Sequence, residues 1–370
     1  MTIVYFIIIL ALLILVHEFG HFVVAKATGM RVDEFGLGFP PRVLRLFKKN
    51  ETEYTLNLLP IGGFVKIFGE NYDDANDPGA QESERSFVSK ARHKQALVLV
   101  AGVTFNMVFA WLLISLGFMI GLPTPVDYDT RGDVVNPQLM ITTVAPGSPA
   151  DRVGLKSGDV IVGLDSSARS LGGALEGPIS PENVTSFIQA HPDDELTFTV
   201  ERGRQVVTVQ AEPEPDIIED GEAVGITMGL IGTLRLPPHQ ALWQGYLTTG
   251  QLTNAVAVGI VTFIYEAFTG AADYAQVAGP VGIVGLVGDA SVLGFVYLLQ
   301  FTALISVNLA IINLVPFPAL DGGRLVMVAI EAVKRSPINP QIANTLNVVG
   351  FVLLLLLMVA VTYNDIINLL

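Results

Sequence analysis

The sequence predicts a polytopic α-helical membrane protein with four transmembrane helices and one inserted α+β domain. Hydrophobic residues make up 51% of the chain and charged residues only 15%, a balance too apolar for an ordinary soluble enzyme. Crossing a bilayer takes ~20 consecutive apolar residues. Four segments meet that requirement, namely residues 3–25, 96–122, 292–314 and 344–363.

These segments divide the chain into three parts. Residues 1–124 form a first membrane half with two spans, residues 125–236 form the soluble insert, and residues 237–370 form a second membrane half. Cysteine is absent, so any zinc ligand must be His, Asp or Glu. The formal net charge of −14 argues against a nucleic-acid partner.

The basic residues predict the orientation of the chain in the membrane. Of 21 Lys and Arg residues, 11 fall between positions 26 and 94, and three fall between positions 324 and 335. Cytoplasmic loops carry the excess of positive charge. We therefore expect these two regions in the cytoplasm, and both termini and the insert outside it.

Residues 241–268 form a fifth apolar stretch, which contains Trp243 and Tyr246 and carries only Glu266 as a charge. If this stretch crossed the bilayer, Lys334 and Arg335 would lie outside the cytoplasm, against the charge rule. We interpret it as an amphipathic helix that is interfacial or re-entrant.

The first span carries the motif H-E-F-G-H at residues 17–21. On a helix, His17 and His21 face the same way and can bind one zinc ion, and Glu18 can take a proton from a zinc-bound water. The alternative is a pair of hydrogen-bonded core histidines. Ionisable residues inside a membrane helix are costly and indicate function, so we favour the metal site.

A third protein ligand is needed, and the sequence L-D-G-G at residues 320–323 offers Asp321. His17 lies 14 residues after Ile3, so a helical rise of 1.5 Å per residue places it roughly 20 Å into the membrane. Asp321 follows the third span, which runs in the same direction, so both reach the cytoplasmic leaflet. The alternative role for Asp321 is a helix C-cap and turn.

Residues 54–68 are strand-like, with a turn at Pro60-Ile61-Gly62-Gly63. The segment is too apolar for a free cytoplasmic loop. One interpretation is a β-hairpin that dips into the membrane beside the site and offers a strand edge. The other is a small hairpin packed on the helix ends.

The insert is predicted to contain a strand at 138–144, a short helix opened by Pro146-Gly147-Ser148-Pro149-Ala150, and a turn into a strand at 154–161. A helix at 181–190 and a hairpin of 196–200 with 205–210 follow. This order, with G-S-P-A and G-L-K-S-G-D-V-I, resembles a bacterial PDZ domain. Such domains bind extended peptides or C-termini by strand addition, and here residues 139–144 are the expected edge, facing the helix at 181–190.

Taken together, H-E-F-G-H, the PDZ-like insert, G-P-V-G-I at 279–283 and N-L-V-P-F-P-A-L-D-G-G at 313–323 resemble the site-2 protease family. The bacterial branch for regulated intramembrane proteolysis, with four spans, is the most similar. This resemblance implies a multi-pass protein of the inner (plasma) membrane, with its active site near the cytoplasmic side.

The resemblance also implies roles for individual residues. His17, His21 and Asp321 would bind Zn²⁺, and Glu18 would be the general base. Asn313 would help to hold the substrate or the oxyanion. The G-G-F segment of the hairpin, which is Gly62, Gly63 and Phe64, would contact the substrate.

The expected activity is zinc-dependent cleavage of transmembrane segments in single-span membrane proteins, such as anti-sigma factors or remnant signal peptides. One alternative is a membrane-anchored PDZ scaffold without catalysis, which predicts no metal. The other is a metal transporter that uses the His and Asp residues for translocation. Transporters tend to show internal repeats, and the sequence shows none.

Overall fold

The computed structural model describes residues 1–70, 83–126, 134–167, 174, 179–203, 205–218, 221–271 and 278–368. The chain forms two compact units. The first consists of Met1–Ser115, Leu242–Gly288 and Leu299–Leu370, and the second of Leu116–Ala241 and Asp289–Leu298. Residues 71–85 and 167–179, which we interpret from the sequence as loops, lie mostly outside the described residues.

The long helices match the predicted spans closely. Among the described residues they are α1 (Thr2–Ala27), α4 (Arg92–Ile120), α7 (Pro238–Thr269), α9 (Phe295–Leu314) and α11 (Pro340–Asn368). The predicted third span starts three residues too early, because Gly294, with φ +121°, separates α9 from the shorter α8 (Pro280–Leu293). A positive φ suits glycine and interrupts a helix.

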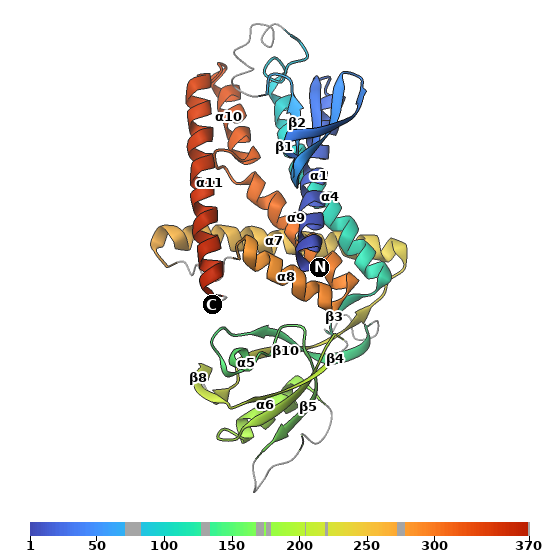
Figure 1. The fold of residues 1–370 in the computed structure, drawn as a ribbon, viewed down its shortest axis with the longest axis vertical. Coiled ribbons are helices and arrows are strands. Elements are labelled where there is room, and N and C mark those ends of the chain that lie inside the picture. Colours follow the sequence, from blue (N-terminus) through green and yellow to red (C-terminus); the bar gives the residue numbers. More distant parts are fainter. Residues whose placement is uncertain are drawn as a thin grey trace. The chain divides into compact units, whose positions relative to one another are not determined.

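The expected count of four spans is not confirmed. In the part of the chain that the structure describes, five helices are long and apolar enough to cross a membrane, and α7 is the one beyond the four expected. In Figure 1, α7 runs crosswise to α1 and α11 within the first unit. The N-terminus and the end of α11 lie at one end of this unit. The other end holds α10 (Asp321–Lys334) and the strands β1 (Val32–Lys49) and β2 (Thr52–Ile67).

The hairpin is larger than expected, because β1 (Val32–Lys49) pairs with β2 (Thr52–Ile67). Residues 32–37 pair with 63–67 on one side and with 53–56 on the other, and residues 42–49 pair with 52–57. The turn predicted at 60–63 thus separates the two halves of β2. Residues 63–67 form one free edge of this sheet among the described residues, and residues 42–49 form the other.

The hairpin packs on the helices at its base and leaves apolar side chains uncovered farther along. Its base packs on the helices through a cluster that includes Met30, Val32, Ile67 and Leu99. Farther along, apolar side chains are uncovered, among them Phe47 and Leu58, which are 53% and 59% exposed. Large exposed apolar patches indicate a partner or a membrane surface.

The third span breaks after Leu314, and a new helix, α10, begins at Asp321. Two prolines, Pro316 and Pro318, lie in the break and prevent the helix from continuing. A Cβ on Gly322 would collide with the carbonyl oxygens of Leu314 and Val315. The alternative of a C-cap is therefore wrong: Asp321 opens a helix, and its glycine neighbour lets that helix fold back onto the break.

The second unit contains a six-stranded antiparallel sheet in the order β3-β10-β4-β5-β6-β7. Its apolar core includes Leu139, Ile161, Val184 and Phe198. The predicted strands, the short helix and the helix at 181–190 are all present. The strands and helices of this unit are β3 (Leu122–Pro125), β4 (Val134–Val144), α5 (Pro149–Arg152), β5 (Val160–Ser166), α6 (Pro181–Ala190), β6 (Leu196–Arg202), β7 (Gln205–Ala211), β8 (Glu214–Ile218), β9 (Gly221–Ala223) and β10 (Ile226–Leu234).

The edge predicted for peptide binding is wrong. Residues 139–144 belong to β4, which is paired with β10 along its length and with β5 through Met140. A strand with neighbours on both sides has no free edge for an added strand. The helix α6 packs against β9 and β10 instead.

Candidate active site

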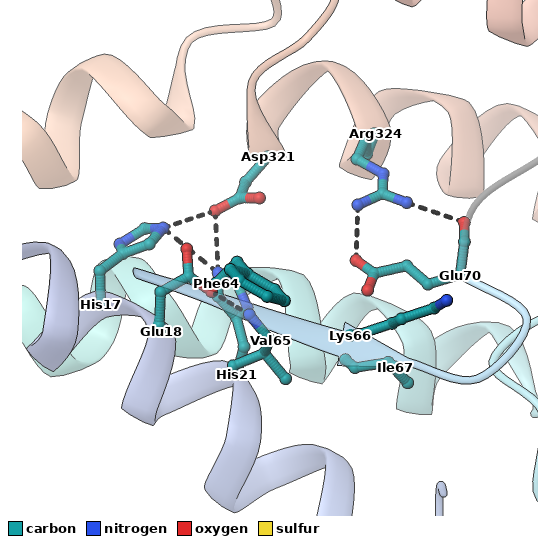
Figure 2. Close-up of a pocket in the computed structure, with 10 residues that line it drawn as sticks. All are labelled: His17, Glu18, His21, Phe64, Val65, Lys66, Ile67, Glu70, Asp321 and Arg324. Carbon is teal, nitrogen blue, oxygen red and sulfur yellow. Dashed lines mark hydrogen bonds and ion pairs between the residues drawn. The ribbon is translucent and has the colours of Figure 1, made fainter. Parts of the chain in front are cut away.

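The two histidines of the first span and Asp321 meet inside the first unit (Figure 2). His17 and His21 are 7% and 8% exposed and lie one turn apart on α1. Asp321 reaches them from the first turn of α10. Each residue offers one ligand atom, and the three can together hold a metal ion.

The spacing of these ligand atoms fits zinc. The Asp321 Oδ2 atom lies 3.0 Å from His17 Nε2 and 3.2 Å from His21 Nε2, and the two Nε2 atoms are 3.2 Å apart. Four ligands arranged tetrahedrally around zinc, with bonds of ~2.0–2.1 Å, are about 3.3 Å apart. Three protein ligands leave the fourth position for water or substrate, as in catalytic zinc sites.

The second nitrogen of His21 fixes its tautomer. His21 Nδ1 lies 2.7 Å from the carbonyl oxygen of Val98 on α4. A carbonyl oxygen only accepts hydrogen bonds, so Nδ1 must carry the proton and donate it. In the neutral imidazole, Nε2 then presents its lone pair to a metal.

The second nitrogen of His17 meets a side chain instead. The amide Nδ2 of Asn106, also on α4, lies 3.3 Å from His17 Nδ1. Asn106 is fully buried, and its Oδ1 has no hydrogen-bond partner among the described residues. Its backbone oxygen accepts a hydrogen bond of 2.8 Å from Ser306 Oγ on α9.

Small residues bring α1 and α4 into close contact at this level. A Cβ on Gly20, within the H-E-F-G-H motif, would lie 2.6 Å from the carbonyl oxygen of Ala101. A Cβ on Gly102 would lie 2.5 Å from His21 Nε2 and 2.8 Å from His17 Nε2. Small residues at helix interfaces allow such backbone approach in membranes. Gly102 therefore keeps the metal-facing side of both imidazoles open.

The variant Gly102→Ala is expected to lose most of its bound zinc and to be destabilised by about 1–3 kcal/mol, the usual cost of overpacking. The added methyl group must push the imidazoles apart or separate the helices. Gly250→Ala is the matched control, because a Cβ at that helix position meets nothing within 4 Å. Zinc content per protein chain measures the effect, and normal zinc in Gly102→Ala would contradict the assignment.

Glu18 lies in the same pocket, which has a volume of about 430 Å³. Its Oε2 accepts a hydrogen bond of 3.1 Å from the backbone N–H of Val65. Val65 belongs to residues 63–67, the free edge of the hairpin sheet nearest the site. The carboxylate thus lies between the histidines and a strand edge (Figure 2).

An ion pair closes another side of the pocket (Figure 2). The Arg324 guanidinium, one turn after Asp321, lies 2.5 Å from Glu70 Oε1 and 2.9 Å from the Glu70 carbonyl oxygen. Glu70 follows the hairpin directly, so this pair ties the hairpin to α10. Both residues line the pocket.

Asp321 is held in its charged form. Burial alone would raise the pKa of its carboxyl group, but its close contacts with His17 and His21 outweigh burial and leave the pKa below its ordinary value. A negative ligand in this position partly neutralises a divalent cation.

The structure brings together four of the predicted site residues, which are His17, Glu18, His21 and Asp321, and places Phe64 on the pocket wall. Gly63 is adjacent, since a Cβ there would lie 3.8 Å from Glu18 Cγ. Asn313 and Gly62 are not among the residues that line this pocket. Asn313 lies half-buried in the last turn of α9.

Sequence reasoning missed Gly102, Asn106, Glu70 and Arg324. For two of them, Gly102 and Asn106, the sequence contained a feature that could have indicated a role. Asn106 is a polar residue inside an otherwise apolar span, which indicates function or interhelical bonding. Ala101-Gly102 is a pair of small residues in the same span. The ion pair of Glu70 and Arg324 joins segments too distant in the chain to be paired from sequence.

Comparison with known proteins decides the family, because the family model for Peptidase family M50 matches residues 5–357. The chain belongs to peptidase family M50. A protein of Clostridium perfringens is 35% identical to this M50 chain over 99% of both sequences. The zinc metalloprotease RasP of Oceanobacillus iheyensis is 30% identical, over 99% of this chain and 98% of RasP. RasP of Geobacillus kaustophilus is 29% identical over 99% and 97%, respectively.

The M50 chain is an intramembrane zinc metalloprotease, as the resemblance to site-2 proteases implied. It is a multi-pass membrane protein. The interpretations as a scaffold without catalysis and as a metal transporter are therefore set aside. Zinc is its cofactor, and the His-His-Asp cluster is the site that can hold it.

Proposed function

We propose that this protease hydrolyses peptide bonds within transmembrane segments of single-span membrane proteins, such as anti-sigma factors or remnant signal peptides. In this proposal His17, His21 and Asp321 hold the zinc ion and Glu18 is the general base. The observation that carries it is the triangle of three ligand atoms with sides of 3.0, 3.2 and 3.2 Å, with Glu18 in the same pocket.

Zinc, when bound, lowers the pKa of a water molecule and polarises the scissile carbonyl group. Glu18 accepts the proton that the attacking water loses and returns it to the leaving amine. The imidazoles of His17 and His21 and the carboxylate of Asp321 stay in place throughout. We assign Asn313 to substrate or oxyanion binding through the family motif alone, and this requires it to turn toward the pocket when substrate is bound.

The substrate must be extended, because a transmembrane helix hides its own peptide bonds in hydrogen bonds. The free edge at residues 63–67 can pair with an unwound segment as an added strand. The N–H of Val65 points off that edge, toward Glu18, so an added strand would pass next to the general base. Gly63 leaves the approach to Glu18 free of a side chain, and Phe64 offers an apolar contact to the substrate.

The variant Val65→Pro is expected to lower cleavage about tenfold or more while zinc content stays normal, because proline removes the backbone donor of the edge. Leu46→Pro is the matched control, since it lies on the opposite edge of the sheet, within residues 42–49. Cleavage of a single-span substrate in proteoliposomes measures the effect. Equal cleavage by Val65→Pro and wild type would refute strand addition at this edge.

We also propose an orientation with both termini and the insert outside the cytoplasm. Figure 1 supports an even number of crossings, since both chain ends of the first unit lie opposite β1, β2 and α10. The helix α7 then lies along the membrane surface. Its Trp243, Tyr246 and Tyr265 are 64%, 60% and 68% exposed, and aromatic residues of this kind concentrate at membrane interfaces.

Single cysteines test this orientation directly, because the chain has none of its own. In spheroplasts, Asp193→Cys is expected to react with an impermeant maleimide from outside, and Ser336→Cys only after the membrane is opened. Labelling of both residues from the same side would mean that α7 crosses the bilayer.

We propose that the insert is a PDZ domain that binds peptide segments or C-termini and thereby governs access of substrates. The exposed edge of β10 at residues 226–229 is the better candidate for strand addition, since β3 covers only residues 231–234. The helix α6 packs against that strand, which gives the strand-and-helix groove that PDZ domains use.

The proteolytic proposal is tested with purified protein in liposomes. Candidate single-span proteins are expected to be cut within their membrane segment, and cleavage is expected to stop on zinc chelation and resume when zinc is added back. Cleavage that persists after zinc has been removed would overturn the proposed chemistry. Cuts confined to residues outside the membrane segment would overturn the proposed substrate class.

A further inference from the structure

The side chain of Asn106 is in an unusual position for a buried amide. Its Nδ2 lies 3.3 Å from His17 Nδ1, and its Oδ1 has no partner among the described residues. The residue is fully buried between α4, α1 and α9. A buried polar atom without a partner is costly and calls for an explanation.

The arrangement suits a histidine that holds no metal. His17 Nε2 can then donate its proton to Asp321 Oδ2, 3.0 Å away, and His17 Nδ1 accepts a hydrogen bond from the Asn106 amide. A metal bound to His17 Nε2 reverses the roles of the two ring nitrogens, because Nε2 must then offer a lone pair and Nδ1 must carry the proton. A neutral imidazole has one N–H group and one lone pair, so the proton must move to Nδ1, which then needs an acceptor.

An asparagine side chain can donate a hydrogen bond to His17 Nδ1 when no metal is bound and accept one from Nδ1–H when a metal is bound. Rotation of its amide by half a turn exchanges Oδ1 and Nδ2 without moving any other atom. The oxygen then faces His17 Nδ1–H, in the same way that the Val98 carbonyl oxygen faces His21 Nδ1 at 2.7 Å. Ser306 donates a hydrogen bond of 2.8 Å to the backbone oxygen of Asn106, so the side-chain amide can rotate while the backbone stays in place.

We propose that Asn106 is a positioning residue, which orients His17 for zinc by accepting a hydrogen bond from its Nδ1–H group. This inference rests on the proposed role of His17 as a zinc ligand. It assigns to the second span, which supplies no zinc ligand, the task of fixing the tautomer of His17. With Val98, it gives both histidines a hydrogen-bond acceptor on the same helix, α4.

The test compares Asn106→Leu, which removes donor and acceptor at similar volume, with Asn106→Asp, which keeps only acceptors. Loss of such a hydrogen-bond partner typically weakens metal affinity 10–100-fold, and we expect an increase of that size in the zinc dissociation constant of Asn106→Leu. Asn106→Asp is expected to bind zinc as tightly as wild type or more tightly. Thr104→Val is the matched control, because Thr104 is exposed on α4 and its hydroxyl donates a hydrogen bond to the Val100 carbonyl oxygen of its own helix.

Zinc dissociation constants are measured on the full-length protein in detergent by competition with a chromophoric chelator. Cobalt is the second probe, and its visible spectrum is expected to change in Asn106→Leu and to stay close to wild type in Asn106→Asp. An unchanged dissociation constant and cobalt spectrum in Asn106→Leu would overturn the inference. So would a tenfold loss of zinc affinity in Asn106→Asp, since that result would mean that Asn106 donates to a metal-bound His17.

These outcomes are separable from failure of the zinc site itself. If wild type and Thr104→Val bind no zinc, the proposed ligands are wrong. If they bind zinc and only the Asn106 predictions fail, the ligands stand and the positioning role falls. Should Asn106→Leu not fold, Asn106→Asp still decides between accepting and donating.

Discussion

Replacement of the proposed base, Glu18→Gln, is expected to reduce cleavage by at least 10²–10⁴-fold, the usual contribution of general acid–base catalysis, and to leave zinc in place. The amide has nearly the shape of the carboxylate and still faces the N–H of Val65. It cannot accept the proton that the attacking water must lose. The three atoms of the metal cluster belong to other residues, so zinc binding is unaffected.

Cleavage in proteoliposomes and zinc content are both measured for this variant. Glu53→Gln is the matched control, because Glu53 is a hairpin carboxylate that pairs with Arg42 and Arg45 away from the pocket. Glu18→Asp retains a carboxylate but shortens its reach by one methylene group, so intermediate activity is expected. Near-native cleavage by Glu18→Gln would exclude Glu18 as the base, and loss of zinc would instead make it a ligand.

The second large effect is expected for Asp321→Asn, which exchanges a charged oxygen ligand for a weaker neutral one. The zinc dissociation constant should rise by more than the 10–100-fold that loss of a supporting hydrogen bond costs. Zinc stabilises the folded protein by about 2.7 kcal/mol when its free concentration is 100 times the dissociation constant. The variant should lose most of that stabilisation, and with it the zinc-dependent rise in melting temperature.

Two further variants sharpen this prediction. Asp321→His is expected to recover part of the zinc affinity but little activity, since imidazole is a good ligand with a different reach. Asp365→Asn is the matched control: Asp365 is a buried carboxylate that accepts hydrogen bonds from the backbone N–H groups of Gly279 and Gly282. It should lower stability without changing zinc affinity.

The competing role for Asp321 is stabilisation of the first turn of α10, where a carboxylate is worth about 0.3–1 kcal/mol. That role predicts full zinc occupancy in Asp321→Asn after dialysis against a chelator strong enough to strip a two-ligand site. Such a result would end the three-ligand assignment, whatever the activity of the variant.

Local patterns predicted most of the elements, because apolar length and turn residues act within a few positions of the chain. The helix at 181–190 was placed to the residue, where Ser180 caps its N-terminus by accepting from the N–H of Asn183. The sequence-based predictions failed where the role of a segment depends on which distant strand pairs with it. Residues 139–144 were expected to be a free edge, but β10, about 90 residues later, pairs with them.

The same distinction between local sequence patterns and long-range contacts applies to the residues of the candidate active site. The motif at residues 17–21 singled out His17, Glu18 and His21 as candidates, since His17 and His21 lie four residues apart and so share one face of a helix. Asp321 could be predicted as the third ligand because the lengths and directions of the first and third spans place it and His17 at a similar depth in the membrane. Gly102 and Asn106 could not be paired with the histidines in the same way, because their role depends on which face of α4 packs against α1.

The sequence alone determined the membrane class of this protein, predicted the bounds of its apolar helices to within a few residues, and singled out His17, His21 and Asp321 as candidate zinc ligands and Glu18 as the candidate base. Hydrophobic length and the turn of a helix fix those features locally. Only the tertiary structure decided the triangle of ligand atoms near 3.2 Å, the strand edge at Val65 and the acceptors behind each imidazole. Those features arise from contacts between helices and strands up to about 300 residues apart in the chain, and the close packing of backbones, made possible by glycines such as Gly20 and Gly102, determines them.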